Sequence, residues 1–376
     1  MSSLLYIAHP TVHLDHLAAP WIHVQGTLSG MKQLGVTAEL LSTPRLVESF
    51  QASGPASRLS RGFARIRLLF GIVSASFSNR CLFIRHYHDI APVYPVLRAL
   101  GRPFAVEVNA TLREEPHGLR RFPTWLLRLS EWLELRALKA APRVVAVSGV
   151  LRARLVERGI SEERVAVVHN GCDPGLTEER TRETATGVDH QGIVFIGNFK
   201  PWHRADLLIE AYSRIDRHIA PDLILVGSGD TRDHEELAES LGVRQKVRFL
   251  GRRERSEVMR IASSASVLVL PNTEDYGSPV KVFEYLGSGR PTVLPDLPNI
   301  REIVTSGEHA LLFTPGDPDH LAASIEILLR DGALASRIAA SARRLALTSY
   351  SWRSNAERIV RFLRAEPCLL PEVSGD

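Results

Sequence analysis

Residues 278–291 read Ser-Pro-Val-Lys-Val-Phe-Glu-Tyr-Leu-Gly-Ser-Gly-Arg-Pro, and this stretch carries the strongest prediction about the fold. Ser278 is a favoured N-cap and Pro279 suits the first helical position. Gly287 and Gly289 end a helix, and Pro291 opens the next strand. The stretch therefore predicts a short helix between a loop and a buried strand.

The front of this helix has the features of a phosphate site. The first amides of a helix and its positive dipole end attract anions. Lys281 and Glu284 are three residues apart and share one face of the helix. A lysine there neutralises a diphosphate, and a glutamate one turn further on accepts hydrogen bonds from a ribose diol. An amphipathic helix with two charged surface residues remains the alternative.

Short apolar runs alternate with helical patterns along most of the chain. Strands are predicted at 4–8, 36–41, 81–85, 104–108, 143–147, 165–168, 193–196, 222–226, 247–250, 267–270, 291–294 and 310–313. Helices are predicted at 58–77, 123–140, 203–217, 232–242, 253–264 and 317–330. Unalternating apolar strands separated by helices are typical of parallel sheets covered on both faces.

The chain of 376 residues exceeds one ordinary core, so two domains are expected. We predict an α/β fold of two Rossmann-like doubly wound domains that face a cleft. An N-terminal domain spans 1–170, an apolar-poor linker spans 171–191, and a C-terminal domain spans 192–349. Ligands of such sheets bind at the carboxyl ends of the strands.

Composition limits the class of protein. Hydrophobic residues make up 44% and charged residues 23%, as in globular proteins. No apolar run reaches 18 residues and no basic leader opens the chain, so a cytoplasmic location is expected. Cys81, Cys172 and Cys368 lie far apart and predict neither a zinc site nor a disulfide framework.

Charge is divided unevenly between the two halves. Residues 1–170 hold 21 Lys and Arg against 12 Asp and Glu, a net charge of +9, whereas residues 171–376 carry −5. The segment 58–77 has Arg58, Arg61, Arg65 and Arg67 among apolar residues. A basic amphipathic helix of this kind binds an anionic membrane surface, or is an ordinary domain helix with an arginine face.

Glycine-containing loops follow three predicted strands of the second domain. Gly197 and Asn198 follow 193–196, and His203 lies at the start of the next helix. An unperturbed histidine has a pKa of about 6.5, so His203 is expected to titrate near neutral pH. Gly227 follows the next strand, but the full dinucleotide fingerprint is absent. Arg252 follows 247–250, where backbone groups are placed to hold a base.

Several polar residues of the first domain raise further hypotheses. Glu107 and Asn109 share one face at a strand end, and Asn109 falls beside the predicted cleft. Ser148 is a predicted N-cap. His86 and His88 share a strand face, but no third metal ligand is specified, so a cleft wall is favoured over a metal site.

Asp317 and Asp319 precede an apolar periodic stretch. Helix capping explains this pair better than metal binding does.

These motifs together resemble the GT-B-fold retaining glycosyltransferases of family 4. The resemblance covers nearly the whole chain and is strongest at 145–148 (VAVS), 167–173 (VVHNGCD), 196–203 (IGNFKPWH) and 278–291, with a further match at 107–110 (EVNA). It implies a nucleotide-sugar donor, an acceptor held by the first domain and a C-terminal helix at 350–366 that crosses back to that domain.

Carried over by position, Glu284 matches the ribose-binding glutamate of the family's E-x7-E motif. The first glutamate of that motif falls at Tyr276. The usual arginine falls at Asn198 and the usual lysine at His203, which leaves Lys281 as the candidate for the diphosphate.

The histidine common at the sugar site of the family falls near Asn109. We therefore predict that Lys281, Asn109 and His203 are catalytic. The predicted donor-binding residues are Gly197, Asn198, Gly227, Arg252, Tyr276, Gly277, Ser278, Val280, Lys281 and Glu284.

The sequence thus predicts a glycosyltransferase that uses a nucleotide-diphosphate sugar, with no metal and no further cofactor. The acceptor is a glycan, a lipid-linked molecule or a small molecule, and an anionic membrane at the inner face is a candidate partner. A non-catalytic nucleotide-sugar-binding or partner-binding protein and a nucleotide-sugar epimerase remain alternatives. A phosphorylase is disfavoured because no cofactor-lysine motif is evident, and a dehydrogenase because GxGxxG is missing.

Overall fold

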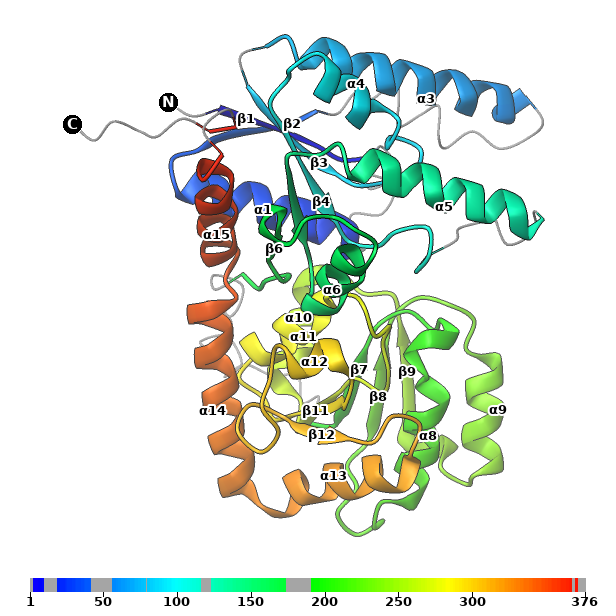
Figure 1. Cartoon of the computed structure of the whole chain (residues 1–376). Helices are drawn as coiled ribbons and strands as arrows, with labels where there is room; N and C mark the ends of the chain where they lie inside the picture. The colour runs from blue at the N-terminus through cyan, green and yellow to red at the C-terminus, as the bar shows by residue number, and fades with distance from the viewer. Residues whose placement is uncertain are drawn as a thin grey trace. The chain divides into compact units, whose positions relative to one another are not determined.

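The computed structural model describes residues 3–9, 19–41, 56–78, 80–115, 123–173, 191–366 and 369–370, without the side chains of 56–62 and 64. The chain forms two compact units (Figure 1). The first comprises Met1–Asn170, Tyr276–Ser278 and Trp352–Asp376, and the second comprises Gly171–Asp275 and Pro279–Ser351. Most of the expected linker, residues 174–190, lies outside the described residues.

The first unit contains a parallel sheet of six strands in the order β2-β1-β3-β4-β5-β6. Its strands are β1 (Ser3–Ile7), β2 (Thr37–Leu41), β3 (Cys81–Arg85), β4 (Phe104–Val108), β5 (Arg143–Ala146) and β6 (Val165–Val167). Its longer helices are α1 (Ala19–Gln33), α3 (Ala56–Ala75), α4 (Val93–Ala99), α5 (Thr124–Leu138), α6 (Gly149–Glu157) and α15 (Trp352–Arg364).

Alternate residues of these strands enter two separate cores. Leu5 and Ile7 of β1 pack with residues of α3, α4, α5 and α6. Leu4 and Tyr6 of the same strand pack with residues of α1 and α15 on the other face. Both faces of the sheet are therefore covered, which explains why its strands read as unbroken apolar runs.

The second unit contains another parallel sheet, in the order β12-β11-β10-β7-β8-β9. Its strands are β7 (Ile193–Ile196), β8 (Leu223–Val226), β9 (Val247–Gly251), β10 (Val267–Val269), β11 (Thr292–Pro295) and β12 (Leu311–Phe313). Its longer helices are α8 (Ala205–Arg214), α9 (Arg232–Ser240), α10 (Arg255–Ser264), α11 (Val280–Gly287), α13 (Pro318–Arg330) and α14 (Gly332–Ser349), with the single turn α12 (Pro298–Arg301) between the last two strands.

The predicted fold class is confirmed, and each predicted strand is present with ends within one residue of those expected. Strand order reverses beside β7 in the second sheet, because β8 lies on one side of it and β10 on the other. In doubly wound sheets the ligand binds at the carboxyl edge next to such a reversal. The loop after β7 is therefore the place to look for a site.

Two helix caps support the local reading of the sequence. The Ser148 side chain accepts from the Leu151 amide and caps α6, as predicted. Asp317 accepts from the amides of Asp319 and His320 and caps α13, which confirms the capping interpretation.

The cap predicted for α11 is wrong. The helix begins at Val280 with Pro279 as the N-cap residue. Ser278 belongs to the first unit, where its hydroxyl accepts from the Asn170 amide at 2.8 Å. The Ser278 hydroxyl therefore pairs with Asn170, which is distant in the sequence, and does not cap the helix that follows it.

The C-terminal helix α15 packs closely on α1 within the first unit. A Cβ added at Gly26 would overlap the Trp352 indole, and one added at Gly30 would overlap the Trp352 carbonyl. These two glycines, one turn apart, allow the backbone of α1 to approach α15.

We expect Gly30→Ala to destabilise the protein by about 1–3 kcal/mol, because the new methyl group meets backbone that has no free space. Thermal unfolding followed by circular dichroism measures this as a lower midpoint. Gly71→Ala is the matched control: Gly71 lies inside α3 with open space around it, so alanine should be neutral or slightly stabilising. Equal midpoints for the two variants would contradict the close packing of α1 and α15.

Candidate functional site

The loops after β7, β8 and β9 are joined by backbone hydrogen bonds at the carboxyl edge of the second sheet. Gly197 donates its amide to the Val226 carbonyl at 2.8 Å, and Gly227 donates to the Gly251 carbonyl at 3.0 Å. A Cβ on Gly227 would overlap the Gly197 carbonyl oxygen. The glycines predicted to bind the donor therefore pack backbone against backbone and form a compact floor.

Lys281 of α11 projects its ammonium group onto this floor. Its Nζ lies 2.9 Å from Nε2 of His203 and 5.5 Å from the ring centre of Phe195. A Cβ on Gly197 would approach Lys281 Nζ to 2.6 Å, so the missing side chain makes room for the amine. The structure thus brings Gly197, His203 and Lys281 together, although the sequence separates them by up to 84 positions.

Burial lowers the pKa of Lys281 to about 7, although the nearby Glu284 carboxylate opposes the shift. The amine is therefore poised between its charged and neutral forms at neutral pH. An anion bound beside it would favour the ammonium form.

The expectation that His203 titrates near neutral pH is wrong for this structure. Burial, together with the Lys281 charge, lowers the pKa of His203 to about 4. Its Nδ1 lies 2.8 Å from the Asn198 carbonyl oxygen and must donate to it, so Nε2 is left to accept from Lys281. His203 is thus a neutral acceptor that holds the lysine in place.

Glu284 lies one turn along α11 and is paired with a residue that sequence reasoning missed. Arg255 Nη1, at the start of α10, lies 2.6 Å from Glu284 Oε1. The glutamate side chain is only 12% exposed, so its charge depends on this pairing. No local pattern connects residues 255 and 284, which is why the pair was not predicted.

The other second-unit candidates are placed differently. Val280 is buried and fills the core at the start of α11, and Arg252 is exposed on the loop after β9. Arg204, next to His203, has a left-handed backbone with φ of 50° and turns its guanidinium to Asp206 at 2.8 Å. Such a strained non-glycine residue is often found next to functional loops.

Tyr276, Gly277 and Ser278 group with the first unit. The Tyr276 hydroxyl donates to Glu115 at 2.7 Å, and its carbonyl accepts from the Ser148 hydroxyl. At the position of the family's first acidic residue, this chain therefore places a tyrosine that is hydrogen-bonded to a glutamate.

Asn109 lies in the first unit just after β4. Its Nδ2 is buried and has no hydrogen-bond partner among the described residues. An unpaired buried donor of this kind is costly and calls for a ligand or water.

Glu107, two residues before Asn109, is fully paired. It accepts from the Tyr6 hydroxyl at 2.6 Å and lies 2.7 Å from His23 Nε2. It is the centre of a structural network and takes no part in the candidate site.

His86 does not have free ring nitrogens for a metal. Nδ1 lies 3.0 Å from the Tyr94 hydroxyl and Nε2 lies 3.0 Å from Glu134. Within the described ranges, no group of three or more His, Cys, Asp or Glu residues is arranged to hold a metal ion.

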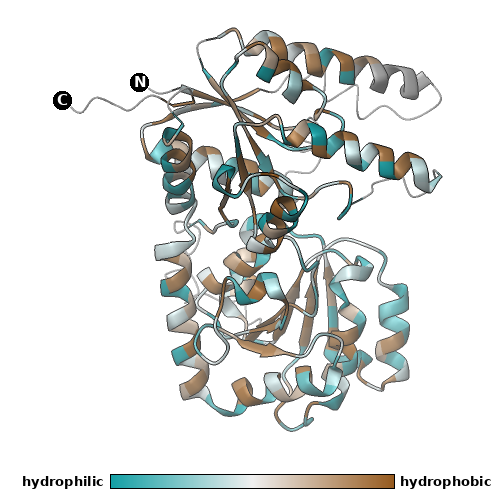
Figure 2. Ribbon diagram, in the orientation of Figure 1, coloured by the Kyte–Doolittle hydropathy of each residue, from teal (hydrophilic) through white to brown (hydrophobic). Residues whose placement is uncertain are grey.

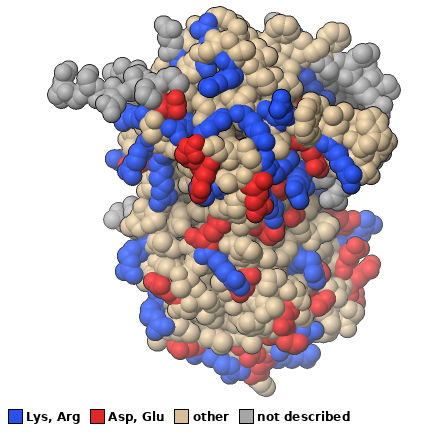
Figure 3. Space-filling model, in the orientation of Figure 1, with Lys and Arg blue, Asp and Glu red and all other residues tan. Residues whose placement is uncertain are grey.

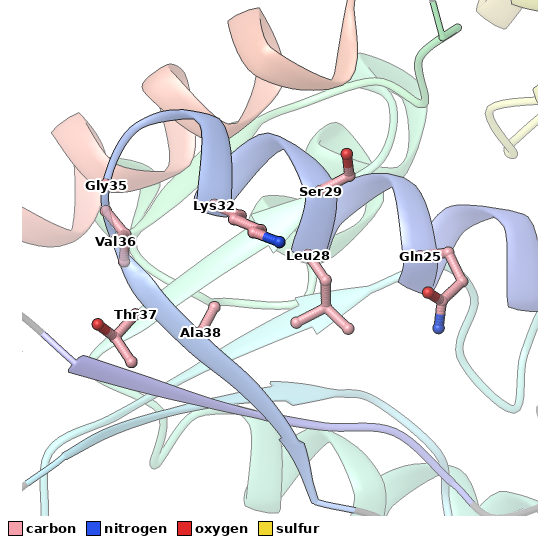
Figure 4. Close-up of a pocket in the computed structure, with 8 residues that line it drawn as sticks. All are labelled: Gln25, Leu28, Ser29, Lys32, Gly35, Val36, Thr37 and Ala38. Atoms are coloured by element: carbon pink, nitrogen blue, oxygen red, sulfur yellow. The ribbon is translucent and has the colours of Figure 1, made fainter. Parts of the chain in front are cut away.

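A hollow of about 610 Å³ between α1 and β2 was not predicted (Figure 4). It is lined by Gln25, Leu28, Ser29, Lys32, Gly35, Val36, Thr37 and Ala38. Gly35–Ala38 lead into β2, so the hollow lies at the amino end of that strand. Ligands of doubly wound sheets bind at the opposite end, and we assign this hollow no role.

Two family models match the chain. "Glycosyl transferases group 1" matches residues 190–331, and "Glycosyltransferase Family 4" matches residues 22–176. The chain belongs to the group 1 glycosyltransferases with the two-domain Rossmann-like fold.

Curated relatives agree with this family. An uncharacterized glycosyltransferase of Methanocaldococcus jannaschii is 30% identical over 211 residues, which cover 53% of each chain. D-inositol 3-phosphate glycosyltransferase of Corynebacterium urealyticum is 30% identical over 239 residues, 58% of this chain and 55% of the relative. The alignments thus span about half the length of these relatives.

Solved structures share the fold at low sequence identity. Anabaena HepE in complex with UDP has a TM-score of 0.71 at 17% identity, covering 97% of this chain and 100% of that one. Sucrose-phosphate synthase from Thermosynechococcus elongatus has a TM-score of 0.76 at 16% identity, covering 97% and 99%.

We expect Lys281→Met to raise the thermal stability of the ligand-free protein at pH 6–7. The folded protein binds this proton less tightly than the unfolded chain does, so the buried charge destabilises it below about pH 7. That cost fades as pH rises from about 7 to about 10.4, the unperturbed value for lysine. The advantage of the variant should shrink over the same window.

Unfolding midpoints measured from pH 6 to pH 10 test this expectation. Lys246→Met is the control, because the Lys246 side chain is 59% exposed and its charge is not buried in the folded protein. A stability gain for Lys281→Met that did not vary with pH would show that the amine is not buried.

Proposed function

We propose that the chain transfers a sugar from a nucleotide-diphosphate sugar to an acceptor, with retention of anomeric configuration. The observation that carries this proposal is the buried Lys281 amine, held by His203 over a glycine floor, one turn from Glu284. Family membership supports the reaction class. The complexes of Anabaena HepE with UDP and with UDP and glucose support the donor class.

In this proposal the donor lies along the carboxyl edge of the second sheet. The diphosphate sits at Lys281 and the first amides of α11, where the ammonium offsets charge that grows on the leaving group. Glu284 accepts from the ribose diol. The base, a uracil or a guanine, meets the loop after β9 at Arg252.

No metal or resident cofactor is required by this scheme, because Lys281 and the helix terminus supply the positive charge. Asn109 in the first unit serves the sugar or the acceptor through its unpaired Nδ2.

We expect Lys281→Met to weaken nucleoside diphosphate binding at least tenfold and to slow transfer. Glu284→Gln should weaken binding by about 1.5–3 kcal/mol, because a charged hydrogen bond becomes a neutral one. Thermal shift and calorimetry with UDP, GDP and their sugars measure the binding, and product formation measures the transfer. Wild-type affinity and turnover in both variants would refute the site, and Lys246→Met should match the wild type.

The pH profile of donor affinity provides an independent readout in the same experiment. A bound diphosphate stabilises the Lys281 ammonium, so its pKa rises above the value of about 7 in the free protein. Binding then takes up a proton between these two pKa values, and wild-type affinity should fall as pH rises above about 7. Lys281→Met should have a flat profile, whereas His203→Gln should keep the fall.

The acceptor side of the proposal rests on the surface of the first unit. Large apolar side chains stand exposed at helical spacing: Phe63 (65%), Ile66 (51%) and Phe70 (72%) on α3, and Trp125 (66%), Leu129 (43%), Trp132 (53%) and Leu133 (53%) on α5. Figure 2 shows hydrophobic positions along both helices. Exposed apolar stripes that include tryptophan are typical of surfaces that bind a bilayer interface.

Basic residues accompany these stripes. Arg65 and Arg67 of α3 and Arg128 and Arg136 of α5 are exposed, and Figure 3 shows Lys and Arg side chains on the first unit with acidic side chains among them. The side chains of Arg58 and Arg61 lie outside the described residues. In the part of the chain that the structure describes, no helix has the length and apolar character to span a bilayer.

We therefore propose a cytoplasmic enzyme that attaches peripherally to an anionic membrane through α3 and α5 and meets a glycolipid, a lipid-linked phosphate or a glycan there.

Co-sedimentation with anionic vesicles tests this attachment. We expect binding that weakens with salt, because the Debye length is only about 8 Å at physiological ionic strength. Trp125→Ser with Trp132→Ser, and Arg65→Glu with Arg128→Glu, should each reduce it severalfold. Arg337→Glu, at an exposed position of α14 in the second unit, is the control. No binding to anionic vesicles at low salt would leave only a soluble acceptor.

A further inference from the structure

The pair formed by Arg255 and Glu284 goes beyond the residues that the motif supplies. Glu284 comes from α11, and Arg255 is the first residue of α10. Nη1 and Oε1 lie 2.6 Å apart, and the two side chains are 27% and 12% exposed. Glu284 Oε1 has no hydrogen-bond partner among the described residues, so this contact is an ion pair, and the attraction between the two largely buried charges keeps the side chains together.

The ion pair between Arg255 and Glu284 also determines which charged groups of the site contact each other. Lys281 is on the same helix face as Glu284 and is a competing partner for its carboxylate. In the structure Lys281 instead reaches His203, while Arg255 takes Glu284 Oε1. Arg255 therefore leaves the lysine available for an anion, and it leaves the second carboxylate oxygen available to accept hydrogen bonds.

We propose that Arg255 is a positioning residue that holds Glu284 in the orientation that recognises a ribose diol. It thereby sets the preference of the site for ribonucleotides over 2′-deoxyribonucleotides. This inference rests on the proposed nucleotide-sugar site.

Calorimetric titration with UDP and 2′-deoxy-UDP tests the role of Arg255. We expect the wild type to favour the ribonucleotide and Glu284→Gln to lose most of that preference. Arg255→Met should reduce UDP affinity about ten- to hundredfold, the range of a charged hydrogen bond, and bring the ratio of the two affinities towards one. The double variant should show no further loss of preference, because both changes disable one unit.

Two further variants separate positioning from general support. Arg255→Lys retains the charge but not the planar fork, so its preference should fall between those of wild type and Arg255→Met. Arg260→Met, at an exposed position further along α10, should leave both affinities unchanged. Thermal unfolding confirms that each variant is folded, and Arg255→Lys serves if Arg255→Met is not.

The outcomes are distinguishable. A wild-type ribose preference that survives in Arg255→Met and Arg255→Lys but is lost in Glu284→Gln overturns the role of Arg255 and keeps the donor site. Failure of the wild type to bind UDP and GDP overturns the proposed function, and this inference falls with it.

Discussion

The first unit depends on a buried carboxylate. Glu107 lies in the middle of a parallel sheet, where burial alone would raise its pKa; the charge and hydrogen bond of His23, with Arg85 and Tyr6, instead lower the pKa to about 2. An unpaired charge in that position would cost several kcal/mol, so its partners are obligatory. His23 in turn contacts the side chain of Asn170. The backbone amide of Asn170 donates to the Ser278 hydroxyl. The buried Glu107 charge is therefore linked through His23 of α1 to Asn170, where the chain leaves this unit, and to the segment Tyr276–Ser278, where it returns.

The candidate donor site contrasts with this network, because its buried charge is a cation without a charged partner in contact in the part of the chain that the structure describes. Its lysine is buried, no carboxylate of the described residues lies at hydrogen-bond distance from it, and the histidine beside it is kept neutral. Such a site is destabilising when empty and is relieved by a bound anion, which is the usual relation between stability and function at binding sites. Gly197 and Gly227, in the loops after β7 and β8, are required because they lack side chains. A side chain at Gly197 would displace the Lys281 amine, and one at Gly227 would displace the neighbouring backbone.

The residues that differ from the family pattern make specific contacts in the structure. Asn198 contributes a backbone carbonyl that fixes the tautomer of His203, and His203 accepts from Lys281. Tyr276 binds Glu115 in the first unit. Arg255 supplies a cation from α10. The candidate site thus keeps Lys281 as its positive centre and Glu284 at the family position of a glutamate, whereas the contacts around them come from residues at other positions.

The sequence alone determined the sheets, the caps at Ser148 and Asp317 and the shared face of Lys281 and Glu284, because apolar periodicity, capping preference and helical spacing are local properties. Tertiary structure alone decided the partners of those polar groups that pair with residues distant in the sequence. Ser278 was expected to cap α11 and instead accepts from Asn170, because a distant amide competes for the same hydroxyl. His203 was expected to titrate near neutral pH and does not, since its pKa depends on burial and on Lys281, 78 residues away. Arg255 had no signal in the sequence, because its ion pair with Glu284 joins two separate helices, α10 and α11, which no local pattern connects.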